Sequence, residues 1–121
     1  MGKIAFVFAG QGAQFPGMGR ELADKYPAAA KVYEICDSIR PGTSRQCFEG
    51  TDEELKETKN TQPCLFAMDL ACAEAAKEAG LEPQAAAGFS LGEIAAVAFT
   101  GMLTLEDAFR LVIRRGEMMQ E

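Results

Sequence analysis

The pattern of apolar and polar positions predicts two short strands separated by a long helical stretch. Residues 4–8 form an apolar run too short for a helix, which predicts a buried strand. Apolar positions in 61–79 and 105–119 recur close to helical spacing and predict helices. Residues 84–88 are small and fit a strand or a helix by propensity alone. The apolar helix predicted over 91–99 favours a strand before it.

Glycine, proline and capping residues predict where further elements begin and end. Gly17, Gly19 and Pro16 indicate a loop over 9–19, and Pro41-Gly42 indicates a loop over 42–50. Between these loops we expect two helices, over 19–25 and 28–38.

Three more signals predict the bounds of the remaining helices. Thr51 and Glu54 form a capping box that opens a short helix. Thr61-Gln62-Pro63 opens the longest helix, with Pro63 in its first turn and Gly80 at its end. Thr104 caps a last helix that runs to about Gln120.

The order strand, helices, strand, tight turn, helix is typical of an open parallel α/β sheet, and we predict the α/β fold class. Two strands alone leave sheet edges unpaired, a situation that natural proteins avoid. Self-association through an open sheet edge is therefore one expectation for this chain.

Composition argues against several classes of function. The 121 residues include 12 Lys and Arg against 18 Asp and Glu, for a net charge of -6. This balance disfavours binding to nucleic acid or to an anionic membrane surface. No apolar run reaches the ~20 residues that a membrane span needs. The length of residues 1–121 corresponds to one domain or less, and we expect neither nucleic acid nor membrane among its partners.

The four cysteines predict neither a zinc site nor a disulfide framework. They stand at 36, 47, 64 and 72 without a C-x-x-C pair, and the chain has no histidine. Cys64 and Cys72 fall on an apolar helix face, where we expect buried free thiols. A reducing, cytoplasmic location follows as the expectation.

Gly88-Phe89-Ser90-Leu91-Gly92 has the G-x-S-x-G pattern of a nucleophile elbow. A serine on a sharp strand-to-helix turn projects its hydroxyl outward, and the glycines avoid collisions with the returning chain. The turn also places Ser90 at a helix N-terminus, where free amides favour negative charge. The amide of Leu91 is the expected oxyanion donor. The alternative is a glycine-rich helix entrance without chemistry.

Two further features are weaker taken singly. Ala9-Gly10-Gln11-Gly12 is a glycine-rich turn at the end of the first strand, where α/β proteins place their sites, but it is equally typical of a simple turn. Arg115 precedes Gly116 on the last predicted helix and can hold a carboxylate in a two-pronged pair. The alternative for Arg115 is a solvated surface position.

Together these motifs resemble one family, the malonyl and acyl transferases of fatty acid and polyketide synthesis. Residues 8–14 resemble its F-P-G-Q-G-S-Q opening, and Thr61-Gln62-Pro63 resembles its T-Q-P helix start. Residues 88–93 resemble G-H-S-L-G-E. Arg115 lies at the spacing of the family's carboxylate-binding arginine. The four motifs occur in the family's order over the whole chain.

The resemblance implies a ping-pong transfer of malonyl from malonyl-CoA to acyl carrier protein through Ser90. The amides of Gln11 and Leu91 would form the oxyanion hole, and Arg115 would bind the malonyl carboxylate. No metal or redox cofactor is implied. The implied fold is the first part of an α/β-hydrolase-like large subdomain, without the ferredoxin-like small subdomain.

Two departures from the family affect these expectations. Phe89 stands where the family usually carries histidine, which puts rate and selectivity in question. The family's base histidine also has no counterpart, because the chain contains no histidine. Glu93 is interpreted as a first-turn helix residue and not as a substitute base. We expect the isolated chain to be incomplete for the full reaction.

Two alternatives stay open at this stage. One is a serine esterase half, which shares the elbow but hydrolyses its acyl-enzyme. The Gln11 turn and the Arg115 spacing argue against it. The other is a non-catalytic truncated fragment that self-associates, which the missing histidine supports.

Overall fold

The computed structural model describes residues 3–120, which form two strands and seven helices. In chain order these are β1 (Ala5–Phe8), α1 (Arg20–Lys25), α2 (Pro27–Ile39), α3 (Thr43–Glu49), α4 (Asp52–Lys56), α5 (Thr58–Glu78), β2 (Ala85–Gly88), α6 (Leu91–Phe99) and α7 (Leu105–Gln120). The predicted α/β class is confirmed, and residues 84–88 adopt the strand that the following helix favoured.

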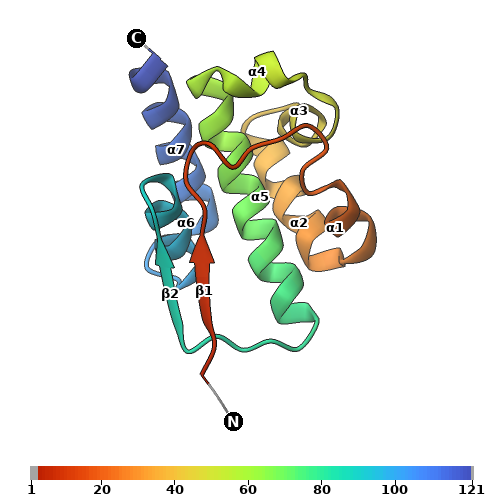
Figure 1. Cartoon of the computed structure of the whole chain (residues 1–121), viewed down its shortest axis with the longest axis vertical. Coiled ribbons are helices and arrows are strands. Elements are labelled where there is room, and N and C mark those ends of the chain that lie inside the picture. Colours follow the sequence, from red (N-terminus) through yellow and green to blue (C-terminus); the bar gives the residue numbers. More distant parts are fainter. Residues whose placement is uncertain (1–2, 121) are drawn as a thin grey trace.

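The two strands form a small parallel sheet on one side of the molecule (Figure 1). Ala5 pairs with Ala85 and Phe8 with Gly88, so the carboxyl ends of both strands reach the same edge. Phe6 and Phe8 face α6, where their rings lie 5.4 and 5.6 Å from that of Phe99. The sheet therefore presents the β1 loop and the β2–α6 turn side by side.

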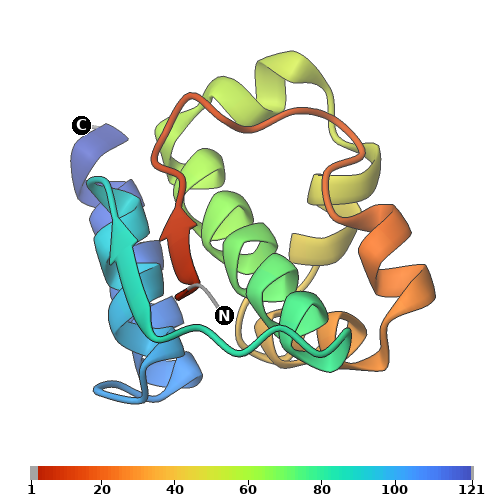
Figure 2. The same ribbon diagram turned by 60° about the horizontal axis from the view of Figure 1, so that its bottom comes forward.

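Helix α5 runs through the centre, between α6 and α7 on one side and α1 and α2 on the other (Figure 2). Its apolar residues are almost all buried, as in Leu65 and Phe66. The ring of Phe66 lies 5.7 Å from that of Phe109 on α7, and both rings are fully buried. This packing fixes α7, and with it Arg115, relative to the sheet.

The predicted start of the longest helix was wrong. Helix α5 begins at Thr58, so Pro63 is its sixth residue and lies beyond the first turn. The amides of Asn60 and Thr61 each donate to the Glu57 carbonyl at 2.8 Å, and the Asn60 side chain donates to the Glu54 carbonyl at 3.0 Å. These contacts build an earlier turn that apolar periodicity does not reveal.

The predicted loop over 42–50 was also wrong, because Thr43–Glu49 forms α3. Asp37 of α2 accepts from the amide of Ser44 at 2.8 Å and from its hydroxyl at 2.5 Å. The side chain that caps this helix thus comes from the preceding helix. Thr43 and Cys47 are buried, which adds packing to the capping.

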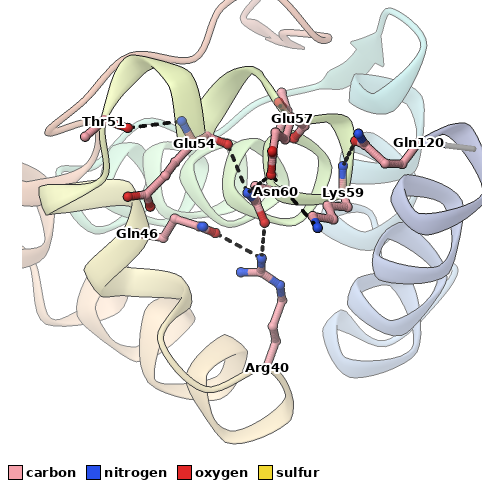
Figure 3. Close-up of polar contacts among 9 residues, drawn as sticks. Arg40, Gln46, Thr51, Glu54, Glu57, Lys59, Asn60 and Gln120 are labelled. Atoms are coloured by element: carbon pink, nitrogen blue, oxygen red, sulfur yellow. Dashed lines mark hydrogen bonds and ion pairs between the residues drawn. The ribbon is translucent and has the colours of Figure 1, made fainter.

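Arg40, at the end of α2, ties this region to α5 (Figure 3). It donates to the side chains of Thr43 at 3.2 Å, Gln46 at 2.9 Å and Asn60 at 3.0 Å. Figure 3 shows the guanidinium reaching Gln46 on α3 and Asn60 on α5 together. We call these four residues the Arg40 network.

Other predicted helix ends are confirmed. The Thr51 hydroxyl accepts from the Glu54 amide at 3.1 Å, and the Thr104 hydroxyl accepts from the Asp107 amide at 3.1 Å. Gly80 follows α5 with a φ of 105°, and its amide donates to the Lys77 carbonyl.

The prediction for the cysteines holds for Cys64, which is buried, and fails for Cys72, which is exposed. Cys72 faces a groove beside β1 that no described residue fills. Cys36 and Cys47 are buried, and all four thiols are free. Among the described residues, no helix combines the length and apolarity that crossing a membrane requires.

Candidate active site

Ser90 occupies a strained turn between β2 and α6. Its φ of 55° and ψ of -112° lie outside the regions that side-chain-bearing residues favour, and it is the one non-glycine residue of 3–120 with a positive φ. Its side chain is exposed. A strained, exposed serine between a strand and a helix is the geometry of a nucleophile elbow.

The two motif glycines are required by close backbone contacts. A Cβ on Gly88 would lie 2.0 Å from the backbone of Gly92, and a Cβ on Gly92 would lie 2.1 Å from the Phe8 carbonyl oxygen. Both distances are far below any van der Waals contact. The steric reason predicted for the G-x-S-x-G pattern is therefore present in this turn.

The Gly10 loop lies directly against the elbow. A Cβ on Gly10 would lie 2.5 Å from the carbonyl oxygen of Phe89 and 3.2 Å from its ring. The Phe89 amide also donates to the Phe8 carbonyl at 3.3 Å. The end of β1 and the residue before Ser90 are thus held together, which brings Gln11 to the site.

Arg115 of α7 points to Ser90. It donates to the Ser90 hydroxyl oxygen at 3.1 Å and to the side-chain oxygen of Gln62 at 2.5 Å. Arg115 is half-buried, whereas Arg110 and Arg114 on the same helix are exposed. The interpretation of Arg115 as a solvated surface residue does not fit this position.

Gln62, which the sequence analysis did not nominate as a site residue, completes a chain of polar contacts. It is 1% exposed, and its amide nitrogen donates to the side-chain oxygen of Gln11 at 3.0 Å. Gln11 in turn lies 3.4 Å from the Thr58 hydroxyl. We call Gln11, Gln62, Ser90 and Arg115 the Ser90 network. The place of Gln62 in the Thr61-Gln62-Pro63 motif was the available signal.

Gly116 lets α7 approach α5 at the level of this network. A Cβ there would lie 3.1 Å from the Gln62 Cβ and 3.1 Å from the Thr58 carbonyl oxygen. The glycine beside Arg115 therefore has a packing reason. It keeps Arg115 and Gln62 within hydrogen-bond distance.

The backbone amides of Leu91 and Gln11, predicted as oxyanion donors, belong to the two turns that meet at Ser90. Leu91 is the first residue of α6, so its amide has no carbonyl partner within the helix. The helix dipole adds partial positive charge beside Ser90. Gln11 reaches the same corner through the β1 loop. Ser90, Arg115 and these amides can together stabilise an anionic group bound at the serine.

Among residues 3–120, the side-chain contact recorded for the Ser90 hydroxyl comes from Arg115 and not from a base. Glu93 is exposed in the first turn of α6, as predicted, and its amide donates to the Ser90 carbonyl at 3.0 Å. The ring of Phe89 is 78% exposed. Neither residue supplies an acceptor for the Ser90 proton in the contacts of residues 3–120. Within the same range, no three His, Cys, Asp or Glu side chains cluster as metal ligands would.

Ser90 thus stands at a strained strand-to-helix turn, with an arginine of the neighbouring helix at its hydroxyl. Residues 5–121 match the acyl transferase domain family. The chain belongs to that family.

Named relatives and solved structures of this family are similar to the chain in sequence and in fold. The chain is 45% identical over 122 residues to the malonyl CoA-acyl carrier protein transacylase of Bacillus subtilis strain 168. This alignment covers 100% of this chain and 38% of the relative. The chain superposes with a TM-score of 0.92 on the crystal structure of malonyl CoA-acyl carrier protein transacylase from Clostridium perfringens, at 34% identity over 99% of this chain and 38% of that one.

A third relative was solved with its partner. A malonyl-transacylase in complex with a holo type II polyketide synthase acyl-carrier protein superposes with a TM-score of 0.89, at 35% identity over 98% of this chain and 39% of that one. The present chain thus spans less than two fifths of the length of each of these relatives, and its fold matches the corresponding part of their large subdomain.

Proposed function

We propose that this chain provides the nucleophile and the carboxylate-binding arginine for transfer of a malonyl group from malonyl-CoA to acyl carrier protein. The observation that carries the proposal is the hydrogen bond between Arg115 and Ser90, 3.1 Å long, at a strained elbow. The names of the relatives support the choice of substrate and acceptor.

The transfer takes place in two displacements at Ser90. The serine oxygen attacks the thioester carbonyl of malonyl-CoA, the carbon–sulfur bond breaks, and CoA leaves as the thiol with the serine proton. The sulfur of the pantetheine thiol of acyl carrier protein then attacks the seryl ester carbonyl, the carbon–oxygen bond to Ser90 breaks, and the thiol proton returns to the serine oxygen. The amides of Leu91 and Gln11 would stabilise the oxyanion in both displacements.

Arg115 would select the malonyl group by its free carboxylate. One methylene separates that carboxylate from the carbonyl bonded to Ser90, so a cation beside the serine oxygen is within reach of it. One terminal guanidinium nitrogen of Arg115 donates to Gln62 at 2.5 Å. The other, which donates to the Ser90 hydroxyl in the free chain, would donate to the malonyl carboxylate instead. An acetyl group has no carboxylate to pair with this cation.

The proposal requires a general base for Ser90, and these 121 residues include no histidine to act as one. A neutral serine is a weak nucleophile, and general-base assistance typically contributes about 10²–10⁴-fold. We therefore propose that Ser90 reacts slowly in the chain by itself and that an added base accelerates it. A cytoplasmic location and independence of metals and redox cofactors stay predictions.

The first experiment is intact-mass analysis of the folded chain after incubation with malonyl-CoA, with Ser90→Ala as the matched control. Imidazole is included in a parallel series as an external base. We expect one malonyl adduct on the wild-type chain, formed faster with imidazole, and none on Ser90→Ala. Circular dichroism of both proteins verifies that they are folded.

The outcomes distinguish the alternatives. A folded chain without an adduct in either series would refute Ser90 as a nucleophile here and would favour a non-catalytic module. An adduct that disappears as free malonate, and that acyl carrier protein thiol does not intercept, would favour the esterase alternative. Transfer to the carrier thiol supports the proposal.

A further inference from the structure

Two of the free cysteines meet where α3 packs against α5. Cys47 of α3 and Cys64 of α5 are both fully buried. The Cys47 thiol donates to the backbone carbonyl of Cys64 at 3.5 Å. The two thiols also interact directly, and this contact is the largest cause of opposite changes in their pKa values. The proposed malonyl transfer does not use this pair.

The surroundings of the pair distinguish one thiol from the other. The contact with Cys47, and then the charge of the Arg40 guanidinium, lower the pKa of Cys64 against the opposing effect of burial. The contact with Cys64 and burial raise the pKa of Cys47. Cys64 is therefore disposed to lose its proton, and Cys47 is disposed to keep it. This asymmetry is typical of an attacking cysteine beside a resolving one.

A groove of about 310 Å³ leads towards Cys64 between α3 and α4, and its lining includes Gln46, Glu49 and Glu54. The Cys64 thiol donates to Oε1 of Gln46 at 3.3 Å, and Arg40 donates to the same oxygen at 2.9 Å (Figure 3). Gln46 thus connects the lining of the groove to the buried thiol. An oxidant as small as hydrogen peroxide would reach the sulfur when Gln46 rotates.

The other two cysteines lack this combination. Cys36 is buried, and burial raises the pKa of its thiol to about 12. Cys72 is exposed, but the sulfur contact recorded for it is the thioether of Met68 at 3.3 Å and not a thiol. Within residues 3–120, neither of them joins a lowered pKa to a direct thiol partner. Cys47 and Cys64 are therefore the pair best suited to oxidation.

We propose that Cys47 and Cys64 form an oxidation site, at which hydrogen peroxide converts the two thiols reversibly into a disulfide between α3 and α5. The Cys64 thiolate attacks one peroxide oxygen, the oxygen–oxygen bond breaks, and hydroxide leaves as water with the proton that Cys64 gave up. Cys64 is then a sulfenic acid. The Cys47 sulfur attacks the Cys64 sulfur, the sulfur–oxygen bond breaks, and a second water leaves with the Cys47 proton.

The oxidation balances and has a structural consequence. The two thiols together lose two electrons and two protons, and the peroxide takes them up. The disulfide would join α3 to α5 and close a loop that contains α4, which restricts the unfolded chain. We expect the urea midpoint of unfolding to rise on oxidation and to return with dithiothreitol. Neither step uses the Ser90 network, so the site is independent of the proposed malonyl transfer.

The test is a map of cysteine pairing in the folded chain after treatment with hydrogen peroxide. Remaining thiols are blocked with iodoacetamide, and the peptides are analysed by mass spectrometry. We expect a Cys47–Cys64 disulfide to form about tenfold faster than any other link and to disappear with dithiothreitol. In the chain unfolded in urea, the shorter loop between Cys64 and Cys72 should close preferentially, because loop closure depends on length.

Three variants separate the two steps. Cys47→Ser should block the disulfide and leave Cys64 as a sulfenic acid that dimedone traps. Cys64→Ser should block both products, and Cys36→Ser, the matched control at a buried thiol, should retain the disulfide.

The map of the unsubstituted chain decides the question even if a serine variant does not fold. A folded chain in which Cys47 and Cys64 stay unlinked would overturn the proposal, whether peroxide modifies Cys72 alone or joins another pair. A folded Cys47→Ser chain without a dimedone adduct at Cys64 would overturn the assignment of Cys64 as the attacking thiol.

Discussion

Two arginine-centred networks of this chain have opposite designs. Arg40 donates to Thr43, Gln46 and Asn60, all neutral acceptors on neighbouring helices (Figure 3). Arg115 donates to one buried acceptor, Gln62, and to one exposed acceptor, the Ser90 hydroxyl. Both arginines are half-buried.

The difference lies in how many donors the protein itself satisfies. The guanidinium of Arg40 joins α2, α3 and α5, and its contacts are those of a structural cross-link. The guanidinium of Arg115 is held on one side and faces an exposed reactive position on the other. An arginine that is oriented by a buried side chain yet keeps donors for an exposed site is suited to bind an anion. We therefore expect substitution of Arg115 to affect recognition and substitution of Arg40 to affect stability.

The largest effect is expected from Gly92→Ala, which disturbs the scaffold of the Ser90 network. The new methyl group would meet the Phe8 carbonyl at 2.1 Å. We expect a loss of about 3 kcal/mol or more in the free energy of unfolding, measured by urea denaturation. Gly116→Ala is the control. Its new methyl group would meet its nearest neighbours at 3.1 Å, and alanine has a higher helix propensity than glycine. Equal losses would contradict the steric account of the elbow.

Arg115→Ala should change recognition much more than stability. Loss of one charge-assisted contact to the malonyl carboxylate should reduce the preference for malonyl-CoA over acetyl-CoA on the order of 100-fold. The assay is seryl-adduct formation with imidazole, and Arg114→Ala is the control on the exposed face of α7. A preserved preference in Arg115→Ala would refute its role as the carboxylate ligand.

Arg40→Ala should show the reverse behaviour. It removes three hydrogen bonds and leaves the acceptors on Gln46 and Asn60 without this donor, so we expect a loss of about 2 kcal/mol in unfolding free energy. Adduct formation by the folded fraction should stay within a factor of about two. A selective loss of malonyl preference in Arg40→Ala would remove the distinction between the two networks.

Asp69→Asn tests a buried acid with no arginine partner through the pH dependence of stability. Burial raises the pKa of Asp69 to about 7 from its ordinary 3.8, so the folded state binds the proton more tightly than the unfolded state. Its contribution to stability is full below pH 3.8 and is lost as the pH rises to 7, at up to roughly 1.4 kcal/mol per pH unit. Asp69→Asn should flatten this dependence in thermal unfolding between pH 4 and 7. An unchanged slope would mean that other groups cause it.

Local sequence patterns predicted most element boundaries because their causes are local. The Thr51 and Thr104 caps and the Gly80 terminus depend on side chains and backbone within a few residues. Helix α3 and the early start of α5 were missed for the opposite reason. Asp37 caps α3 from another helix, and the α5 start relies on contacts to the Glu54 and Glu57 carbonyls.

The candidate site divides in the same way. Ser90, Leu91, Gln11 and Arg115 were nominated from short motifs and from resemblance to the family, and the structure brings them to one corner. Gln62 was visible only as part of a helix-start motif. Its role became evident when α5 placed it between Gln11 and Arg115.

The sequence by itself determined the strand–turn–helix around Ser90, because the steric demands of Gly88 and Gly92 act within five residues. It also determined the α/β class, since apolar periodicity and caps are local properties of the chain. Only the tertiary structure decided that Arg115 meets Ser90 across 25 residues of sequence and that Asp69 lies unpaired beside an open strand edge. Both contacts depend on how α5 packs against α7 and β1, and such long-range packing cannot be derived from local patterns of apolar and capping residues.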